Sequence, residues 1–248
     1  MHDGVATITL QGVNAGTYDV DVNYVSENKE YTQPKEKVAF TVTQAIVGMD
    51  VNIANVTYGE AVEIIANITT DGAPINSGKI YIIIDNVAYV ANVTNNTAKV
   101  TIPKLDAGEY ASKILFVDDN YNTKFVAANF TVEKMDAQIG ANNQAYIINY
   151  GGKYTVKNIL AGEKVSFVLN GKNIGSAVAN ANGEATITLT AGILKTAKAG
   201  SKNLIIKLNE ANFNNPTKTV KITINKENTK LVAKTRNSKK PKRPKNTQ

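Results

Sequence analysis

The stretch Asn182-Gly-Glu-Ala-Thr-Ile-Thr188 near the end of the chain has two earlier counterparts. They are Asp3-Gly-Val-Ala-Thr-Ile-Thr9 and Asn95-Asn-Thr-Ala-Lys-Val-Thr101. Each begins with turn-forming residues and continues into the alternating β-branched residues that are typical of a strand. The same short turn and strand therefore occur three times in the chain.

An Ala-Gly pair follows each copy, and its glycines lie 92 residues apart in both steps. The pairs are Ala15-Gly16, Ala107-Gly108 and Ala199-Gly200. Each repeat then ends in a strand-like run, at 38–42, 128–132 and 219–224. A period of this length that carries strands indicates tandem β-domains, each large enough for its own core. It favours a function in reach and contact over catalysis.

The middle repeat, 45–134, contains about seven strand-like runs separated by turn signals. A continuous apolar run at 79–85 suits a central strand, and Asp85-Asn86 predicts a hairpin to the next run. The expected strands cover 49–53, 62–68, 79–85, 87–93, 97–102, 109–117 and 125–132. Short strands with frequent turns are typical of an immunoglobulin-like sandwich.

The third repeat, 135–227, follows the same plan, and Asn170-Gly171 predicts a hairpin there. The first repeat, 1–44, opens at the motif that stands halfway through the other copies, so we expect only its last three strands. We therefore predict an all-β fold of tandem immunoglobulin-like β-sandwich domains, two complete, with a C-terminal half-domain at the N-terminus. The chain reads as a fragment of a longer array, with a half-domain completed by partner strands as the alternative.

The net charge of +7 comes from the end of the chain. Residues 228–248 hold eight Lys or Arg and no acid, which leaves 20 basic against 21 acidic residues, a net charge of −1, in 1–227. We expect 228–234 to start a further repeat and 235–248, which contains the run Lys239-Lys-Pro-Lys-Arg-Pro-Lys245, to be disordered. Such a tail offers charge-based binding to an anionic polymer, nucleic acid or cell wall. No aromatic residue accompanies the charges for stacking on bases, so nucleic acid is not a favoured partner.

The residue inventory leaves little for catalysis. Cysteine is absent and His2 is the single histidine, so nucleophilic triads and zinc sites have no residues to build from. We expect no enzyme activity and no cofactor. Asp118 and Asp119 form the densest oxygen cluster, which predicts an Asx-rich turn and, as an alternative, a weak Ca²⁺ site.

Five N-glycosylation sequons occur, all in the middle repeat: Asn55, Asn67, Asn92, Asn95 and Asn129. Their number is close to chance for a chain this rich in Asn and Thr, so only their confinement to one repeat is suggestive. Asn67 and Asn129 fall on the polar phase of their strands, where a glycan has room. They are candidate modification sites.

Three features together resemble the bacterial Ig-like repeats: the Asp/Asn-Gly-x-Ala-Thr-Ile-Thr strand, the Ala-Gly-x-Tyr corner and the Asn-Tyr or Asn-Phe turn. The turns are Asn120-Tyr121 and Asn212-Phe213. Such repeats stand in tandem in the large adhesin-like surface proteins of methanogenic archaea and some bacteria, and the resemblance covers about residues 1–234. It implies that Tyr18 and Tyr110 form structural tyrosine corners. The third repeat has Lys202 at this position, so it must close its corner otherwise.

The resemblance also implies an exported protein at the cell surface, although the chain starts without a signal peptide and has no apolar stretch of about 20 residues for a membrane span. We expect a non-catalytic segment of an adhesin-like protein that contacts a surface ligand, protein or glycan. A passive stalk that carries a distant binding tip is the competing hypothesis. Binding through the basic tail is the third.

Overall fold

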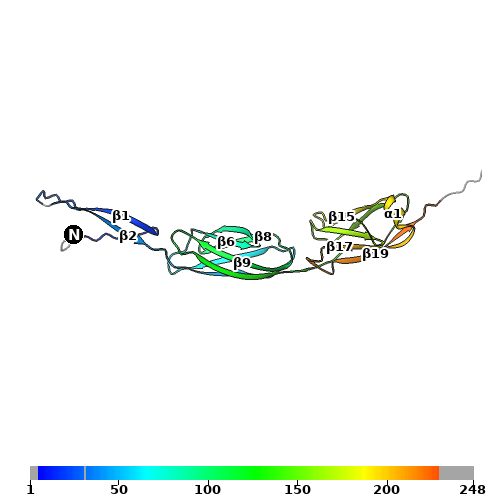
Figure 1. Ribbon diagram of the computed structural model, residues 1–248, viewed down its shortest axis with the longest axis horizontal. Helices are drawn as coiled ribbons and strands as arrows, with labels where there is room; N and C mark the ends of the chain where they lie inside the picture. The colour runs from blue at the N-terminus through cyan, green and yellow to red at the C-terminus, as the bar shows by residue number, and fades with distance from the viewer. Residues whose placement is uncertain (1–4, 31, 229–248) are drawn as a thin grey trace, which may run out of the picture. The chain divides into compact units, whose positions relative to one another are not determined.

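The structure is a computed structural model that describes residues 5–30 and 32–228, and its strands can be followed by colour in Figure 1. The chain forms two compact units. The first unit contains Met1–Ala137 and Asn209–Pro216, and the second contains Gln138–Leu208 and Thr217–Gln248.

The first unit therefore includes two segments that the sequence repeat assigns to the third domain, 135–137 and 209–216. Here β11 (Met135–Asp136) pairs in parallel with β18 (Phe213–Asn214). The divisions of the chain near residues 44, 134 and 227 stay predictions.

The middle repeat is a sandwich of two sheets. Three strands form the first sheet in the order β3-β5-β8: β3 (Gly48–Ile53), β5 (Val62–Thr69) and β8 (Thr97–Ile102). Five strands form the second sheet in the order β4-β10-β9-β6-β7: β4 (Val56–Thr57), β6 (Lys79–Ile84), β7 (Val87–Asn92), β9 (Gly108–Val117) and β10 (Lys124–Glu133). All pairs are antiparallel except β4 with β10. This is the predicted immunoglobulin-like architecture.

The core of this sandwich follows from the side-chain periods of its strands. In β5, Val62 and Ile64 are buried while Glu63 between them is exposed, as alternation requires. The apolar run in β6 is the central strand expected, because it pairs with both β9 and β7. Asp85 and Asn86 join β6 to β7 with φ of 48° and 64°, which confirms the predicted hairpin.

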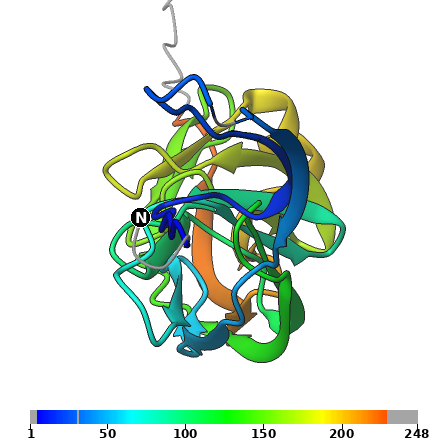
Figure 2. The ribbon, with the colours of Figure 1, turned by 90° about the vertical axis from the view of Figure 1, so that its left-hand side faces the viewer.

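The first repeat consists of β1 (Gly16–Asn23) and β2 (Lys35–Val42), a curved two-stranded ribbon (Figures 1 and 2). Residues 6–15 form no strand, so two strands are present where the sequence predicted three. The reason lies in the middle repeat, where the counterpart strand β8 pairs with β5 alone. Among the described residues before 45, no counterpart of β5 is present to pair with this copy of the motif.

The second unit repeats the sandwich with a smaller first sheet, in which β13 (Gly152–Val156) pairs with β16 (Ala185–Leu189). Its second sheet has the order β12-β19-β17-β14-β15: β12 (Gln144–Ile147), β14 (Lys164–Leu169), β15 (Lys172–Val178), β17 (Gly200–Lys207) and β19 (Thr217–Asn225). Asn170-Gly171 joins β14 to β15 with positive φ at both residues, as predicted. Tyr154 is fully buried edge-on to Phe167 between the sheets.

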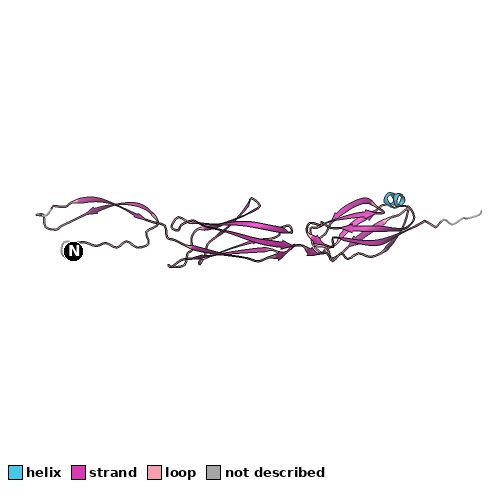
Figure 3. Ribbon diagram, turned by 60° about the horizontal axis from the view of Figure 1, so that its bottom comes forward, coloured by secondary structure: helices cyan, strands magenta, loops and turns pink. Residues whose placement is uncertain are grey.

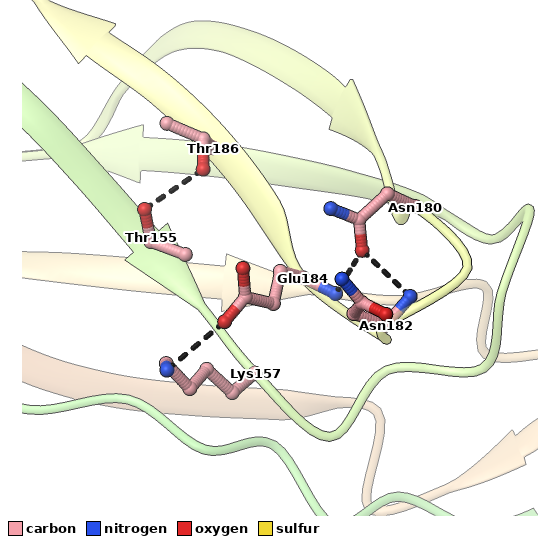
Figure 4. A network of polar contacts seen from close by, with 6 residues as sticks. All are labelled: Thr155, Lys157, Asn180, Asn182, Glu184 and Thr186. Atoms are coloured by element: carbon pink, nitrogen blue, oxygen red, sulfur yellow. Dashed lines mark hydrogen bonds and ion pairs between the residues drawn. The ribbon is translucent and has the colours of Figure 1, made fainter.

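The recurring motif forms a tight turn that leads into β16 (Figure 4). Asn180 Oδ1 accepts the backbone N–H groups of Asn182 and Glu184, each at 3.0 Å. Glu184 Oε1 lies 2.9 Å from Lys157 Nζ on the neighbouring segment. Asn180, two residues before the motif, thus closes the turn locally.

One helix, α1 (Ala191–Ala197), stands between β16 and β17 and is the single helix in the described ranges (Figure 3). It was not predicted. Thr190 caps it by accepting the N–H of Ile193, and Leu194 and Ala197 are buried beneath it. The helix occupies the place along the chain where the middle repeat has only the short connection 103–107.

Candidate contact surfaces

All five candidate glycosylation residues lie exposed on the middle repeat. Asn67 on β5 accepts the Thr97 hydroxyl at 3.1 Å, and Asn55 before β4 accepts the Thr131 N–H at 2.9 Å. Asn92 ends β7, Asn95 lies in the turn before β8, and Asn129 lies on β10. Each candidate side chain is therefore open to solvent, and two of them already serve the structure through their amide oxygen.

Asn55 and Asn129 line one shallow groove of about 490 Å³ on the middle repeat. The other lining residues are Glu109, Tyr110, Ala111, Phe130 and Thr131. The groove is largely polar, with amide, carboxylate and hydroxyl groups on its walls. The remaining three sequons lie outside this groove.

The two corner tyrosines make the same contact. Tyr18 Oη donates to Asn14 O and Tyr110 Oη donates to Asp106 O, each at 2.8 Å and four residues back along the chain. Each ring also stacks on a phenylalanine of the neighbouring strand, at a centroid distance of 5.3 Å. The phenylalanines are Phe40 and Phe130. Burial, then the negative charge of Asp106, raises the pKa of Tyr110 above its ordinary value.

The third repeat has a different surface at the same place. Lys202 occupies the tyrosine position, and α1 stands just before it. A groove of about 600 Å³ opens between α1 and the β14–β15 hairpin. It combines apolar, amide and hydroxyl groups from Leu169, Asn170, Asn173, Ile174, Ile193 and Thr196. The sequence signal for α1 was the Thr190 cap before Ala-Gly-Ile-Leu-Lys-Thr-Ala.

Asp118 and Asp119 lie in the turn that follows β9. Asp118 Oδ1 accepts the N–H of Asn120 at 2.7 Å, which is the geometry of an Asx turn. The backbone carbonyl of Asp119 accepts the Gln44 amide at 3.0 Å. In the described part of the chain, no three His, Cys, Asp or Glu side chains gather as metal ligands.

Two asparagines that the sequence analysis did not single out as site residues make contacts 105 residues away. Asn120 Oδ1 accepts the Ala15 N–H at 2.8 Å, and Asn212 Oδ1 accepts the Ala107 N–H at 2.9 Å. Both alanines belong to the Ala-Gly corners of the preceding sequence repeat. The recurring Asn-Tyr and Asn-Phe turns marked these asparagines in the sequence, but no local sequence rule identifies the distant partner of a turn.

The β1–β2 ribbon has an apolar face without cover from another sheet. Val20, Val22 and Val38 are 37%, 46% and 51% exposed. Residues 229–248, with most of the predicted further repeat and the basic tail, lie outside the described residues. Over the described ranges, no helix has the length and apolar character needed to cross a membrane.

Comparisons with solved structures found similar tandem β-domains. A tandem repeat from the extending region of a large adhesion protein is 13% identical, over 89% of this chain and 59% of that one, with a TM-score of 0.47. Fibronectin(III)-like modules of Clostridium thermocellum are 17% identical, over 74% of this chain and 100% of theirs, with a TM-score of 0.29. Invasin, a bacterial integrin-binding protein, is 17% identical, over 72% of this chain and 39% of its own, with a TM-score of 0.40.

No protein-family model matches the chain. No curated protein matches it either.

Proposed function

We propose that this chain is a non-catalytic immunoglobulin-like repeat segment of an adhesin-like protein at the cell surface, and that it contacts a surface ligand, protein or glycan. The groove beside α1 is the observation that favours contact. The middle and third repeats share their strand plan, and the third departs from it where α1 and the β14–β15 hairpin enclose this groove. A module that serves only as a spacer has no need of such a departure.

The groove has the mixed character of a recognition surface. Ile174 and Ile193 are half-buried on its walls, which leaves apolar surface for a ligand to cover. Asn170 and Lys172 stand exposed at its rim and provide donors and an acceptor for orientation. A neutral or weakly acidic surface polymer matches this combination.

A binding screen with the full chain tests the proposal. The labelled protein is applied to arrays of surface glycans and to intact cells, beside the variant Thr196→Arg, which places a long side chain in the groove. Thr196 is exposed and its hydroxyl donates only to Gly192 O, so the fold should persist. Lys195→Arg, on the same helix but outside the lining residues, is the matched control.

We expect binding by the parent chain and by the control, with a loss in Thr196→Arg. Binding that is equal in all three proteins places the contact elsewhere. Binding that is absent throughout favours the passive stalk. That alternative draws support from the repeated contacts of Asn120 and Asn212, which join each sequence repeat to its neighbour.

The basic tail is tested separately. Removal of 228–248 should abolish affinity for DNA or for anionic cell-wall polymer if the tail is the binding segment. Retained affinity assigns such binding to the repeats. High salt should weaken tail binding steeply, because it depends on released counterions.

A further inference from the structure

The turn at 209–214 belongs to the third repeat by sequence and to the first unit by structure. It lies between β17 and β19 along the chain, two strands of the second unit. Within the first unit, Asn212 accepts the N–H of Ala107, 105 residues earlier. The segment therefore leaves its own sequence repeat and packs with the preceding one.

The same arrangement occurs one repeat earlier. Asn120, in the turn at 118–122, accepts the N–H of Ala15, again 105 residues earlier. The two distances, 2.8 Å and 2.9 Å, are nearly equal. Two independent copies of one contact indicate a feature of the module rather than an accident of one loop.

Each of these asparagines joins three segments. The side-chain oxygen accepts from the Ala-Gly corner, and the backbone oxygen accepts from the segment that links the repeats. Asn120 O accepts the Ala45 N–H at 2.9 Å, and Asn212 O accepts the Met135 N–H at 3.0 Å. A short side chain with a neutral acceptor suits this position, since the turn, the link and the corner meet around it.

In the later of the two contacts, the asparagine is buried. Asn212 is 2% exposed, and its amide also donates to Asp106 Oδ1 at 2.9 Å, so both ends of the side chain have partners. The next residue, Phe213, is 3% exposed and packs edge-on against Tyr58 at 5.3 Å. An aromatic anchor beside a satisfied polar group is the composition of an energetically important contact.

The first repeat shows the turn in its undocked form. Asn28 lies 92 residues before Asn120 and holds the equivalent place after β1. Its Oδ1 accepts the N–H of Glu30 at 3.0 Å and closes the turn locally. The residue after it is Lys29, where the docked turns have Tyr121 and Phe213. The sequence holds no Ala-Gly corner 105 residues before Asn28, so this turn serves as the reference for an Asn turn without a docking contact.

We propose that the Ala-Gly corner of a repeat is a docking surface for the Asn-(Tyr/Phe)-Asn turn of the repeat that follows it in sequence. The partner that this surface fits is another copy of the same module. Docking stabilises the corner, so the local stability of each repeat depends on its successor. The proposal concerns how repeats join and holds for an adhesive segment and for a stalk alike.

Hydrogen exchange on the full chain tests this. Asn212→Ala should raise the exchange rate of the Ala107 amide about tenfold, because a part-buried hydrogen bond is lost and its partners are left unsatisfied. Asn120→Ala should do the same at Ala15 and leave Ala107 unchanged. Asn28→Ala removes an equivalent turn residue that is not docked, and it should affect neither alanine.

Unchanged exchange at Ala107 in Asn212→Ala overturns the proposal. Equal effects of Asn28→Ala at the two corners overturn it as well, because they assign the protection to turns in general. Should Asn212→Ala unfold the whole first unit, Asn120→Ala decides the question, since Asn120 is only half-buried and its loss leaves the middle core intact. Hydrogen exchange at these two alanines does not report ligand binding. Failure of the docking proposal is therefore distinguishable from failure of the proposed adhesive function.

Discussion

Tyr18 lies opposite Phe40 across β1 and β2, and Tyr110 lies opposite Phe130 across β9 and β10. The ring stacking and the tyrosine hydrogen bond are alike in the two places. Exposure is not. Four residues after these tyrosines, Val22 is 46% exposed, while its counterpart Ile114 is fully buried.

Two paired strands are enough for the tyrosine contacts, whereas burial of the inner apolar face needs the whole sandwich. The tyrosine hydrogen bond and the ring stacking depend on contacts within four residues and with one neighbouring strand, so a hairpin is enough to form these two contacts. Burial of the inner face needs β6 beside β9 and the opposite sheet β3-β5-β8. The first repeat has the strand pair without these covering strands, and its apolar face stays open.

The largest effect should come from truncation of the inner face. Ile114→Ala creates a cavity in the middle core and should destabilise the first unit by about 2–5 kcal/mol. Val22→Ala removes a half-exposed side chain and should cost less than about 1 kcal/mol. Urea unfolding, monitored by hydrogen exchange of the amides in β9 and in β1, measures the costs of the two substitutions separately.

Val22→Ala is also the variant that would break the comparison. A cost equal to that of Ile114→Ala would mean that the β1–β2 face is covered in solution by another chain. An unchanged response of β9 to Val22→Ala confirms that the two inner faces are independent.

Alkaline pH extends the comparison to the second unit, which lacks a tyrosine at its corner but buries Tyr146 in β12. Burial, then the neighbouring Tyr154, raises the pKa of Tyr146 to about 12, above the ordinary value of about 10. The unfolded chain therefore loses this proton first, and stability present below pH 10 falls as the pH rises toward 12.

The slope is at most about tenfold in the unfolding equilibrium constant per pH unit for this one proton. Thermal unfolding of the full chain between pH 9 and 12, with the second unit followed by hydrogen exchange, measures it. Tyr146→Phe removes the titrating hydroxyl and should flatten the decline. A decline of the same steepness in Tyr146→Phe would assign it to another group.

The sandwich itself was predictable because its signals are local and repeated. Alternation in 62–68, the hairpin residues Asp85-Asn86 and Asn170-Gly171, and the 92-residue period each depend on neighbours along the chain. The third strand of the first repeat failed as a prediction because a strand also needs a partner, and no counterpart of β5 is present among the described residues before 45. The residue pattern of a strand does not show whether its partner strand is present.

The candidate surfaces were predictable only in part. The exposure of Asn67 and Asn129 follows from their phase in a strand. The helix α1 was not predicted, because its seven residues are too few for a helical period to stand out; its local signals are the Thr190 cap and the apolar Leu194. The partners of Asn120 and Asn212 lie 105 residues away, and no single-sequence rule reaches that far.

The corner hydrogen bond gives the next contrast. Tyr110→Phe leaves the exposed Asp106 carbonyl without the donor that the half-buried Tyr110 provides and should cost about 1 kcal/mol. Tyr18→Phe removes the same bond in the ribbon, where water replaces the hydroxyl more easily, and should cost about half as much or less. Hydrogen exchange near each corner in the full chain is the measurement. Equal costs would show that the corners have equal burial in solution.

The smallest effect should come from ion pairs on the outer faces. Lys99 Nζ lies 2.7 Å from Glu63 Oε1 between β8 and β5, and Lys37 Nζ lies 3.8 Å from Asp21 Oδ1 between β2 and β1. Both pairs are exposed, so Lys99→Ala should cost no more than about 0.5 kcal/mol and Lys37→Ala should be neutral.

Half-molar salt should erase the difference between these two variants, because it screens exposed charges. A cost at Lys37 that exceeds the cost at Lys99 and resists salt would mean that the ribbon pair is shielded from solvent. The same covering partner that Val22→Ala detects through packing would then be detected through charge. Val22→Ala tests packing and Lys37→Ala tests charge, so the two variants examine the ribbon independently. If both show an open ribbon, the difference in exposure between β1–β2 and β9–β10 follows from the absence of covering strands.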